Sequence, residues 1–201
     1  MATASRVEQA MRAVPRRSFL PADQQRHSER DAPLPIGYGQ TNSQPTTVRQ
    51  MLELLDVQPG DLVLDVGCGS GWTTALLAWL TGPTGRVWGV ERLPALVAFA
   101  TANVETAGMP WAQVSQALPH VLGLPAHAPY ERILVSAQAR WLPDRLVDQL
   151  APGGVLVVPV AGRMLRVSTS RDGSHGPSVE EHGWYRFVPL VDDSPSSPVV
   201  D

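Results

Sequence analysis

Lysine is absent from the sequence, since all 16 of its basic residues are arginines. Without lysine, the chain cannot form a Schiff base with a carbonyl substrate or hold a phosphate with an ammonium group. Cysteine is nearly absent too, and the single Cys68 excludes an intramolecular disulfide and any metal site built from several cysteines. The chain also lacks an apolar run of about 18 residues, so no membrane-spanning helix is expected.

An excess of positive charge is missing as well. The formal net charge is -3, which provides no basic surface for nucleic acid. Residues 1–13 include Glu8 and Arg12 and lack the apolar core of a signal peptide. The histidines show no helical metal-ligand spacing such as i, i+4. We expect a cytoplasmic protein with no metal, no membrane association and no nucleic-acid partner, and we take a monomer as the working expectation.

Strand-like and helix-like segments alternate from residue 62 to residue 160. Short apolar runs predict strands at 62–66, 86–90, 112–115, 132–135 and 155–160. Longer apolar or periodic segments predict helices at 72–80, 94–107 and 143–150. This alternation predicts an α/β fold, with a doubly wound, mostly parallel sheet covered by helices on both faces.

The flanking segments complete a single domain over residues 1–190. Helices are expected at 6–14 and 46–55, and the Pro- and Gly-rich segment 15–45 between them is expected to be irregular but packed. An antiparallel hairpin is expected from 164 to 190. The domain then has three parts: an N-terminal helix and active-site loop (1–45), a cofactor-binding core (46–160) and the C-terminal hairpin (161–190). The polar, Pro-rich tail 191–201 is expected to be disordered.

A glycine-rich loop gives the sharpest functional signal. Residues 65–71 read Asp-Val-Gly-Cys-Gly-Ser-Gly, between a predicted strand and a predicted helix. An open α/β sheet binds ligands at the carboxyl ends of its strands, and glycines there allow the backbone to approach a ligand closely. The spacing is G-x-G-x-G rather than the G-x-G-x-x-G of dinucleotide-binding proteins. Serine is not the central residue, so the loop does not resemble an esterase nucleophile elbow.

Two acidic residues indicate which ligand the loop binds. Asp65 stands just before the loop, where a carboxylate would repel a pyrophosphate but attract a cationic amino group. Glu91 lies 20 residues after Gly71, at the end of the second predicted strand, where its carboxylate can accept both hydroxyls of a ribose. S-adenosylmethionine has an amino group and a ribose but no phosphate, so it is the expected cofactor. The alternative is a tight strand-to-helix turn beside a surface glutamate.

Segments on both sides of the loop narrow the class further. Residues 14–21 read Val-Pro-Arg-Arg-Ser-Phe-Leu-Pro, and residues 33–45 read Pro-Leu-Pro-Ile-Gly-Tyr-Gly-Gln-Thr-Asn-Ser-Gln-Pro. Together with residues 65–71, 128–135, 149–154 and 186–190, these runs resemble the protein-L-isoaspartate O-methyltransferase family. The resemblance covers nearly the full chain and implies a class I, Rossmann-like methyltransferase fold.

The resemblance also implies a reaction. The family transfers the methyl group of S-adenosylmethionine to the α-carboxylate of an isoaspartyl residue, which leaves S-adenosylhomocysteine and starts the repair of damaged proteins and peptides. A carboxylate is already ionised at pH 7, so this reaction needs no general base. Because a carboxylate that attacks a sulfonium cancels two charges, the site must chiefly align the two groups and exclude water.

Individual residues receive roles from the same resemblance. Ser43 takes the position of the family's active-site hydroxyl, although a serine bonded to its own backbone is the alternative. The residues expected to bind the cofactor are Thr41, Asn42, Asp65, Gly67, Cys68, Gly69, Gly71, Glu91 and Gln116. The residues expected to contact the peptide substrate are Ile36, Tyr38, Gln44, Gln138 and Arg140.

One departure from the family pattern concerns the adenine. After the third predicted strand the family carries Gly-Asp-Gly, whose aspartate holds the adenine amino group, whereas residues 114–120 here read Val-Ser-Gln-Ala-Leu-Pro-His. Gln116 is the best replacement for that aspartate. A neutral hydrogen bond is roughly 1 kcal/mol weaker than a charged one, so we expect cofactor binding weaker by a factor of about ten.

A second departure lies at residues 136–141, Ser-Ala-Gln-Ala-Arg-Trp, which are bulkier and more polar than the family's pattern. Arg140 is expected to bind a peptide carboxylate and Trp141 to pack on the peptide, the alternative being a solvated arginine and a partly buried tryptophan. Three functions therefore stay open. They are repair of isoaspartyl proteins, esterification of aspartate or isoaspartate in one dedicated peptide, and a degenerate domain kept for binding. Retention of Asp65, Glu91 and Ser43 argues against the last.

Overall fold

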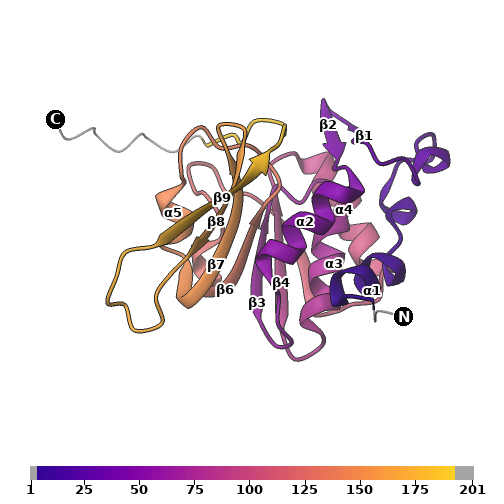
Figure 1. Cartoon of the computed structure of the whole chain (residues 1–201). Coiled ribbons are helices and arrows are strands. Elements are labelled where there is room, and N and C mark those ends of the chain that lie inside the picture. The colour runs from indigo at the N-terminus through magenta and orange to yellow at the C-terminus, as the bar shows by residue number, and fades with distance from the viewer. Residues whose placement is uncertain (1–3, 193–201) are drawn as a thin grey trace.

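A seven-stranded sheet runs through the molecule in the strand order β5-β4-β3-β6-β7-β8-β9 (Figure 1). The computed structural model describes residues 4–192. The strands of the sheet are β3 (Leu62–Val66), β4 (Arg86–Glu91), β5 (Ala112–Gln116), β6 (Tyr130–Val135), β7 (Leu150–Val160), β8 (Arg163–Ser168) and β9 (Ser178–Trp184). The first five pair in parallel, while β8 and β9 are antiparallel. The expected α/β class, the mostly parallel sheet and the antiparallel C-terminal strands are confirmed.

The chain leaves the centre of the sheet in two directions. From β3 it proceeds outward through β4 to β5, then returns to β6 beside β3 and proceeds outward again through β7. The reversal lies between β3 and β6, which pair at Leu64 and Ile133. Open α/β sheets bind ligands at such a reversal, outside the carboxyl ends of the strands. The loop after β3 and the segment after β6 therefore meet where a ligand is expected.

Helices cover the sheet unequally. They are α1 (Arg6–Ala13), α2 (Pro45–Leu55), α3 (Trp72–Thr81), α4 (Pro94–Thr106) and α5 (Asp144–Val147), with 3-10 turns η1 (Arg16–Phe19), η2 (Gln25–His27) and η3 (Pro125–His127). Side chains of α1, α2 and α3 share one core with sheet residues such as Val63, Val87 and Val157. On the other face, Leu64 and Ile133 pack with α5 and the loop before β6. Both faces are covered, as expected, but the second face has one short helix within residues 4–192.

The pattern of apolar residues explains which faces of α2 and α3 are buried. In α2, Pro45 occupies the first turn, and Val48, Met51, Leu52 and Leu55 are buried along one face, as predicted. In α3, every residue except Trp79 is buried, which agrees with a helix that is apolar on nearly every side. Because α3 begins directly after the glycine-rich loop, its burial fixes the position of that loop.

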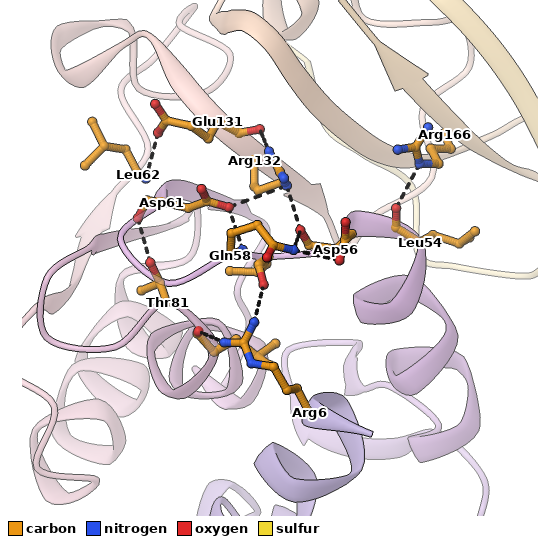
Figure 2. Close-up of polar contacts among 12 residues, drawn as sticks. Arg6, Leu54, Asp56, Gln58, Asp61, Leu62, Thr81, Glu131, Arg132 and Arg166 are labelled. Carbon is orange, nitrogen blue, oxygen red and sulfur yellow. Dashed lines mark hydrogen bonds and ion pairs between the residues drawn. The ribbon is translucent and has the colours of Figure 1, made fainter. Parts of the chain in front are cut away.

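Polar contacts hold the edge of the sheet where the parallel strands begin (Figure 2). Arg132 on β6 donates to the Asp56 carbonyl at 3.1 Å, and its guanidinium lies 3.5 Å from the Asp61 carboxylate. Burial raises the pKa of Asp61. Arg166 on β8 donates to the Leu54 carbonyl at 3.0 Å, so the antiparallel strands are attached to α2. This edge is closed by side chains, and the carboxyl ends of the strands remain for ligands.

The segment 15–45 is more regular than expected. It contains η1, η2 and a hairpin of β1 (Leu34–Gly37) and β2 (Gln40–Asn42). The prediction of irregular backbone was wrong here, because alternate burial over the four residues of β1 is too short to show as a period. The prediction that the segment is packed is confirmed, since Phe19, Leu34 and Ile36 are buried.

Between residues 143 and 160, two of the predicted boundaries of helices and strands were wrong. The helix expected at 143–150 spans only Asp144–Val147, because Leu150 already pairs with Tyr130 as the first residue of β7. Residues 152–154, which separate the expected helix from the strand expected at 155–160, lie inside β7 at a shift in pairing register. Tertiary pairing with β6 therefore extended the strand through a Pro-Gly-Gly sequence that favours a turn.

The C-terminal hairpin ends earlier than expected. Strand β9 stops at Trp184, and residues 185–190 return to the carboxyl end of β6, where Gln138 forms a bridge with Pro189. This return brings a segment from the far end of the chain to the ligand-binding edge. The tail expected to be disordered spans residues 191–201. Residues 193–201 of it lie outside the described residues, whereas Val191 and Asp192 are described and line a cavity. Within residues 4–192, no helix combines the length and the hydropathy needed to span a membrane.

Candidate active site

The loop between β3 and α3 is shaped by its own backbone. The amide of Gly71 donates to the Cys68 carbonyl at 2.9 Å, and the amide of Gly67 donates to the Val90 carbonyl on β4 at 2.9 Å. Gly71 has a φ of 86°, a left-handed conformation that residues with a side chain rarely adopt. A β-carbon there would also lie 3.1 Å from the Ala100 carbonyl oxygen on α4. Glycine is therefore needed at position 71 both for the turn and for close packing against α4.

Asp65 is fully buried at the end of β3. Its Oδ2 accepts hydrogen bonds from the hydroxyls of Thr73 and Thr74, each at 2.7 Å. Burial raises the pKa of Asp65 to about 6, although the two hydroxyls lower it. Its Oδ1 is buried and has no hydrogen-bond partner within the described part of the chain. A buried, unpaired carboxylate oxygen is costly unless a ligand supplies a donor, ideally a cationic one.

Glu91 is buried at the end of β4. Its Oε1 accepts from the backbone amides of Arg92 and Leu93 at 2.8 and 3.0 Å, and its Oε2 accepts from the Gly69 amide at 3.1 Å. A carboxylate offers roughly four acceptor sites, so these three bonds leave room for about one more donor. Gln116 is the register partner of Glu91 on β5.

Two cavities open at the carboxyl ends of the strands. The first, of about 240 Å³, is bounded by the glycine-rich loop, the ends of β4 and β5 and residues 188–192. The second, of about 530 Å³, is bounded by residues 43–50 of the loop and α2 and by residues 184–188. Thr41, Ser136 and Val188 line both cavities, so these three residues mark the place where the two meet.

A buried arginine attaches the 15–45 segment to the glycine-rich loop. The Arg16 Nε donates to Oδ1 of Asn42 at 2.7 Å, and its other nitrogens donate to the carbonyls of Arg30, Ala32 and Asn42. Asn42 in turn donates from Nδ2 to the Ser70 hydroxyl at 3.0 Å. Burial lowers the pKa of Arg16 to about 10, so the guanidinium keeps its charge at pH 7. This hydrogen-bond network holds β2 against the glycine-rich loop.

The residues expected at the cofactor are largely brought together. Five of them line the first cavity: Thr41, Gly67, Gly69, Glu91 and Gln116. Asn42 and Cys68 instead line a small cavity of about 30 Å³, and burial raises the pKa of the Cys68 thiol, which favours its protonated form. Asp65 and Gly71 line none of these three cavities, so their expected contacts with the cofactor stay predictions.

The residues expected at the substrate divide into those at the second cavity and those away from it. Ser43 and Gln44 both line this cavity, and the Gln44 amide donates to Asp31 at 3.0 Å. The Ser43 side chain forms no hydrogen bond with residues 4–192, so the alternative of a serine bonded to its own backbone does not describe it. Ile36 is only 4% exposed, whereas Tyr38 at the tip of the β1–β2 hairpin is 66% exposed.

Gln138 and Arg140 lie outside both cavities. The backbone of Gln138 is bonded to Val188 and Leu190, and the Arg140 guanidinium lies 4.8 Å from the centroid of the exposed Trp141 ring. The expected contacts of Gln138 and Arg140 with a peptide thus gain no support from the positions of the cavities.

Among the lining residues that the sequence did not predict, Ser136 and Trp184 stand out. Ser136 follows β6, and its hydroxyl is buried without a hydrogen-bond partner in the described region. Trp184, at the end of β9, is 71% exposed and lines the second cavity. Neither stands in a motif, because Ser136 begins the segment that departs from the family pattern and Trp184 is far in sequence from the other lining residues.

Comparison with known proteins establishes the family. A family model for Protein-L-isoaspartate(D-aspartate) O-methyltransferase matches residues 1–195. The chain belongs to this methyltransferase family. Proteins named Protein-L-isoaspartate O-methyltransferase from Aeropyrum pernix and Methanopyrus kandleri are 45% and 44% identical to it. The alignments cover 95% and 93% of this chain, and 74% and 84% of those proteins.

Solved structures share the fold of this family member. A structure named protein-L-isoaspartate O-methyltransferase gives a TM-score of 0.84 at 22% identity. The match covers 94% of this chain but only 62% of that longer chain. A Plasmodium falciparum structure described as a protein-L-isoaspartate O-methyltransferase beta-aspartate methyltransferase, in complex with S-adenosyl-L-homocysteine, gives a TM-score of 0.81 at 24% identity. That alignment covers 95% of this chain and 92% of that chain. At these identities the likeness concerns the fold, and it confirms the class I methyltransferase architecture.

Proposed function

We propose that this family member is an S-adenosylmethionine-dependent carboxyl O-methyltransferase acting on L-isoaspartyl residues of damaged proteins or peptides. The family match over residues 1–195 supports the reaction class. The observation that carries the proposal is the pair of adjoining cavities, one bounded by the glycine-rich loop and Glu91, the other by Ser43. Group transfer requires two sites whose occupants meet, and Thr41, Ser136 and Val188 stand where they would meet.

The residues of the first cavity fit S-adenosylmethionine. Glu91 keeps about one acceptor site for a ribose hydroxyl, and the Gln116 amide oxygen can accept from an adenine amino group. The unpaired Oδ1 of Asp65 suits a cationic amino group close to the loop. Two carboxylates at the loop would repel the pyrophosphate of a dinucleotide. When bound, this cofactor supplies an electrophilic methyl group on a cationic sulfur.

The residues of the second cavity suit a carboxylate that needs no deprotonation. An isoaspartyl α-carboxylate is ionised at pH 7, so no side chain has to accept a proton. The Ser43 hydroxyl can donate one hydrogen bond that orients this carboxylate. A neutral hydroxyl stabilises the free carboxylate less than an arginine would, and therefore leaves it more nucleophilic.

The walls of the two cavities can exclude water from the transfer. Residues 184–188 form one wall, and the Tyr185 hydroxyl donates to Gln50 on α2 at 2.9 Å, which fixes that wall to the helix. On the other side Asn42 holds β2 to the glycine-rich loop. Excluding water strengthens the electrostatic contacts inside the site and prevents hydrolysis of the methyl donor.

A methyl-transfer assay tests the proposal. Purified protein is mixed with radiolabelled S-adenosylmethionine and a short isoaspartyl peptide, with the normal aspartyl peptide as control, and base-labile methyl ester is counted. We expect label on the isoaspartyl peptide alone. Ser43→Ala should lower kcat about tenfold, the worth of one hydrogen bond to a charged group, without changing the KM for the cofactor. Ser18→Ala, an exposed serine on η1, is the matched control and should leave both constants unchanged.

Other outcomes distinguish the alternatives. Cofactor binding, measured by calorimetry, without methylation of any generic isoaspartyl peptide would indicate an enzyme dedicated to one peptide. Absence of cofactor binding would indicate a degenerate domain and would contradict the proposal. We further propose that residues 1–190 act as one domain, in the cytoplasm, as a monomer that does not bind nucleic acid. Sedimentation at the chain mass of 21.7 kDa would support the monomer.

A further inference from the structure

Trp184 is a large apolar side chain left exposed at the mouth of the second cavity. It is 71% exposed and lines the same cavity as Ser43, Gln44 and Gln50. Exposed tryptophans are common elements of binding surfaces because they provide a large contact area and lose little conformational entropy on binding. The position of this one, within the wall that faces the proposed catalytic serine, sets it apart from an ordinary surface residue.

The Trp184 ring is held in place before any substrate arrives. Arg163, its register partner on β8, places its guanidinium carbon 3.8 Å from the ring centroid. Arg163 is itself held by an ion pair with Glu181 at 2.9 Å. A β-carbon at Gly162 would lie 3.4 Å from Cε3 of the ring, so the ring rests close against the glycine backbone. The Arg163 guanidinium thus lies over one face of the ring, while the side chain as a whole stays 71% exposed.

From this geometry we infer that Trp184 is a specificity-determining platform, on which a large apolar or aromatic side chain flanking the isoaspartyl residue of the substrate packs. The inference rests on the proposed function, because it takes the second cavity to be the peptide site. A peptide whose isoaspartyl carboxylate reaches Ser43 lies in a cavity bounded mainly by residues 184–188 on one wall and residues 43–50 on another. Only the first of these walls carries an exposed aromatic ring.

The chain itself supplies a matched control. Trp141 is 70% exposed and also lies under an arginine, Arg140, at 4.8 Å, but it lines neither cavity. Replacing Trp184 or Trp141 by alanine therefore removes the same ring, with nearly the same exposure and the same type of neighbour. The two variants differ in whether the ring faces the second cavity.

Isoaspartyl peptides with phenylalanine or glycine at the two positions on either side of the isoaspartyl residue are compared by KM and kcat. The wild-type chain should prefer phenylalanine at one or more of these positions by about three- to tenfold in KM, the range expected of an aromatic pair. Trp184→Ala should abolish this preference, because the KM of the phenylalanine peptides should rise to that of the all-glycine peptide measured with the same variant. Trp184→Phe should retain most of the preference, and Trp141→Ala should retain all of it.

An unchanged preference in Trp184→Ala would overturn the inference while leaving the proposed function intact. Calorimetric titration of the same peptides into the chain saturated with S-adenosylhomocysteine provides a readout that does not need turnover. If no peptide is methylated but phenylalanine peptides bind through Trp184, the platform stands and the proposed reaction fails. If no peptide binds, both fail. Circular dichroism of each variant establishes that a lost preference does not reflect a lost fold.

Discussion

At the scale of single residues, Gln116 is the clearest departure with a measurable consequence. It stands at the exposed end of β5, beside Glu91 and in the first cavity. Gln116→Asp should tighten cofactor binding about tenfold, because a carboxylate accepts a stronger hydrogen bond from an adenine amino group than an amide does. Calorimetry with S-adenosylhomocysteine measures the change. Gln113→Asp, exposed on the same strand but outside the cavities, should leave the affinity unaltered.

An unchanged or lower affinity of Gln116→Asp would mean that repulsion from Glu91 outweighs the new contact, or that the adenine lies elsewhere. Measuring the affinity of Gln116→Asp for S-adenosylhomocysteine at low and at high salt distinguishes these two explanations. Repulsion between the buried Glu91 and the exposed carboxylate introduced at position 116 weakens as salt is added, whereas a misplaced adenine gives no salt dependence.

Asp65 predicts a dependence of folding stability on pH. Its pKa of about 6 in the folded chain lies above the usual aspartate pKa of 3.8, so the folded state binds more protons than the unfolded state between these two pH values. The stability contributed by this group is therefore full below pH 4 and is lost as the pH rises through 6, by about 3 kcal/mol. Urea unfolding of wild type and Asp65→Asn across pH 4–8 should show this decline in the wild type only.

The same carboxyl also predicts a dependence of cofactor affinity on pH. If Asp65 attracts the cationic amino group, affinity should fall as the pH drops below about 6 and the carboxyl becomes neutral. Asp65→Asn should bind weakly at every pH, with the pH dependence removed. A pH-dependent affinity that persists in Asp65→Asn would assign the effect to another group.

At the scale of elements, Arg16 decides how the 15–45 segment sits on the glycine-rich loop. Arg16→Met should destabilise the chain by about 3 kcal/mol, because it leaves the buried Asn42 Oδ1 and three carbonyls without the Arg16 donors. Arg16→Lys should lie in between, since lysine keeps the charge but cannot reproduce the forked contacts. Urea unfolding measures both. Arg17→Met, exposed on the same turn, should change stability by less than about 0.5 kcal/mol.

Limited proteolysis locates the effect within the element. Cleavage of Arg16→Met should increase between residues 20 and 45, whereas the parallel strands should stay protected. Increased cleavage spread over the whole chain would indicate global destabilisation instead, and would argue against a local role for the Arg16–Asn42–Ser70 network.

At the scale of the whole molecule, the first cavity is assembled from segments far apart in the chain, including Thr41 on β2, Glu91 on β4 and Val188 near the C-terminus. Ligand binding should therefore stabilise the complete fold. S-adenosylhomocysteine at about 100 times its Kd should add roughly 2.7 kcal/mol and raise the Tm by about 5–10 °C. Differential scanning calorimetry measures the shift, and Asp65→Asn at the same concentration should show a smaller one. No shift in the wild type would contradict the cofactor assignment.

Sequence alone determined the parts of this molecule that depend on local pattern. The buried strand before Gly67, the buried helix after it and the amphipathic helix with Val48 and Leu52 all follow from apolar periodicity. The glycine spacing and the position of Glu91 indicated the cofactor class, because such motifs lie within one strand-loop-helix unit or one strand end. These features require only neighbours in the chain, so the sequence carries them directly.

Only the tertiary structure decided how distant segments share one site. Strand β7 continues through Pro152 because it pairs with β6. Residues 185–190 lie at the ligand-binding edge of the sheet because they pair with the segment after β6. The tertiary structure also placed Trp184 rather than Trp141 at the second cavity, although both are exposed beside an arginine. The two tryptophans differ in their tertiary environment and not in any local pattern, so their roles follow from strand pairing, which a single sequence does not display.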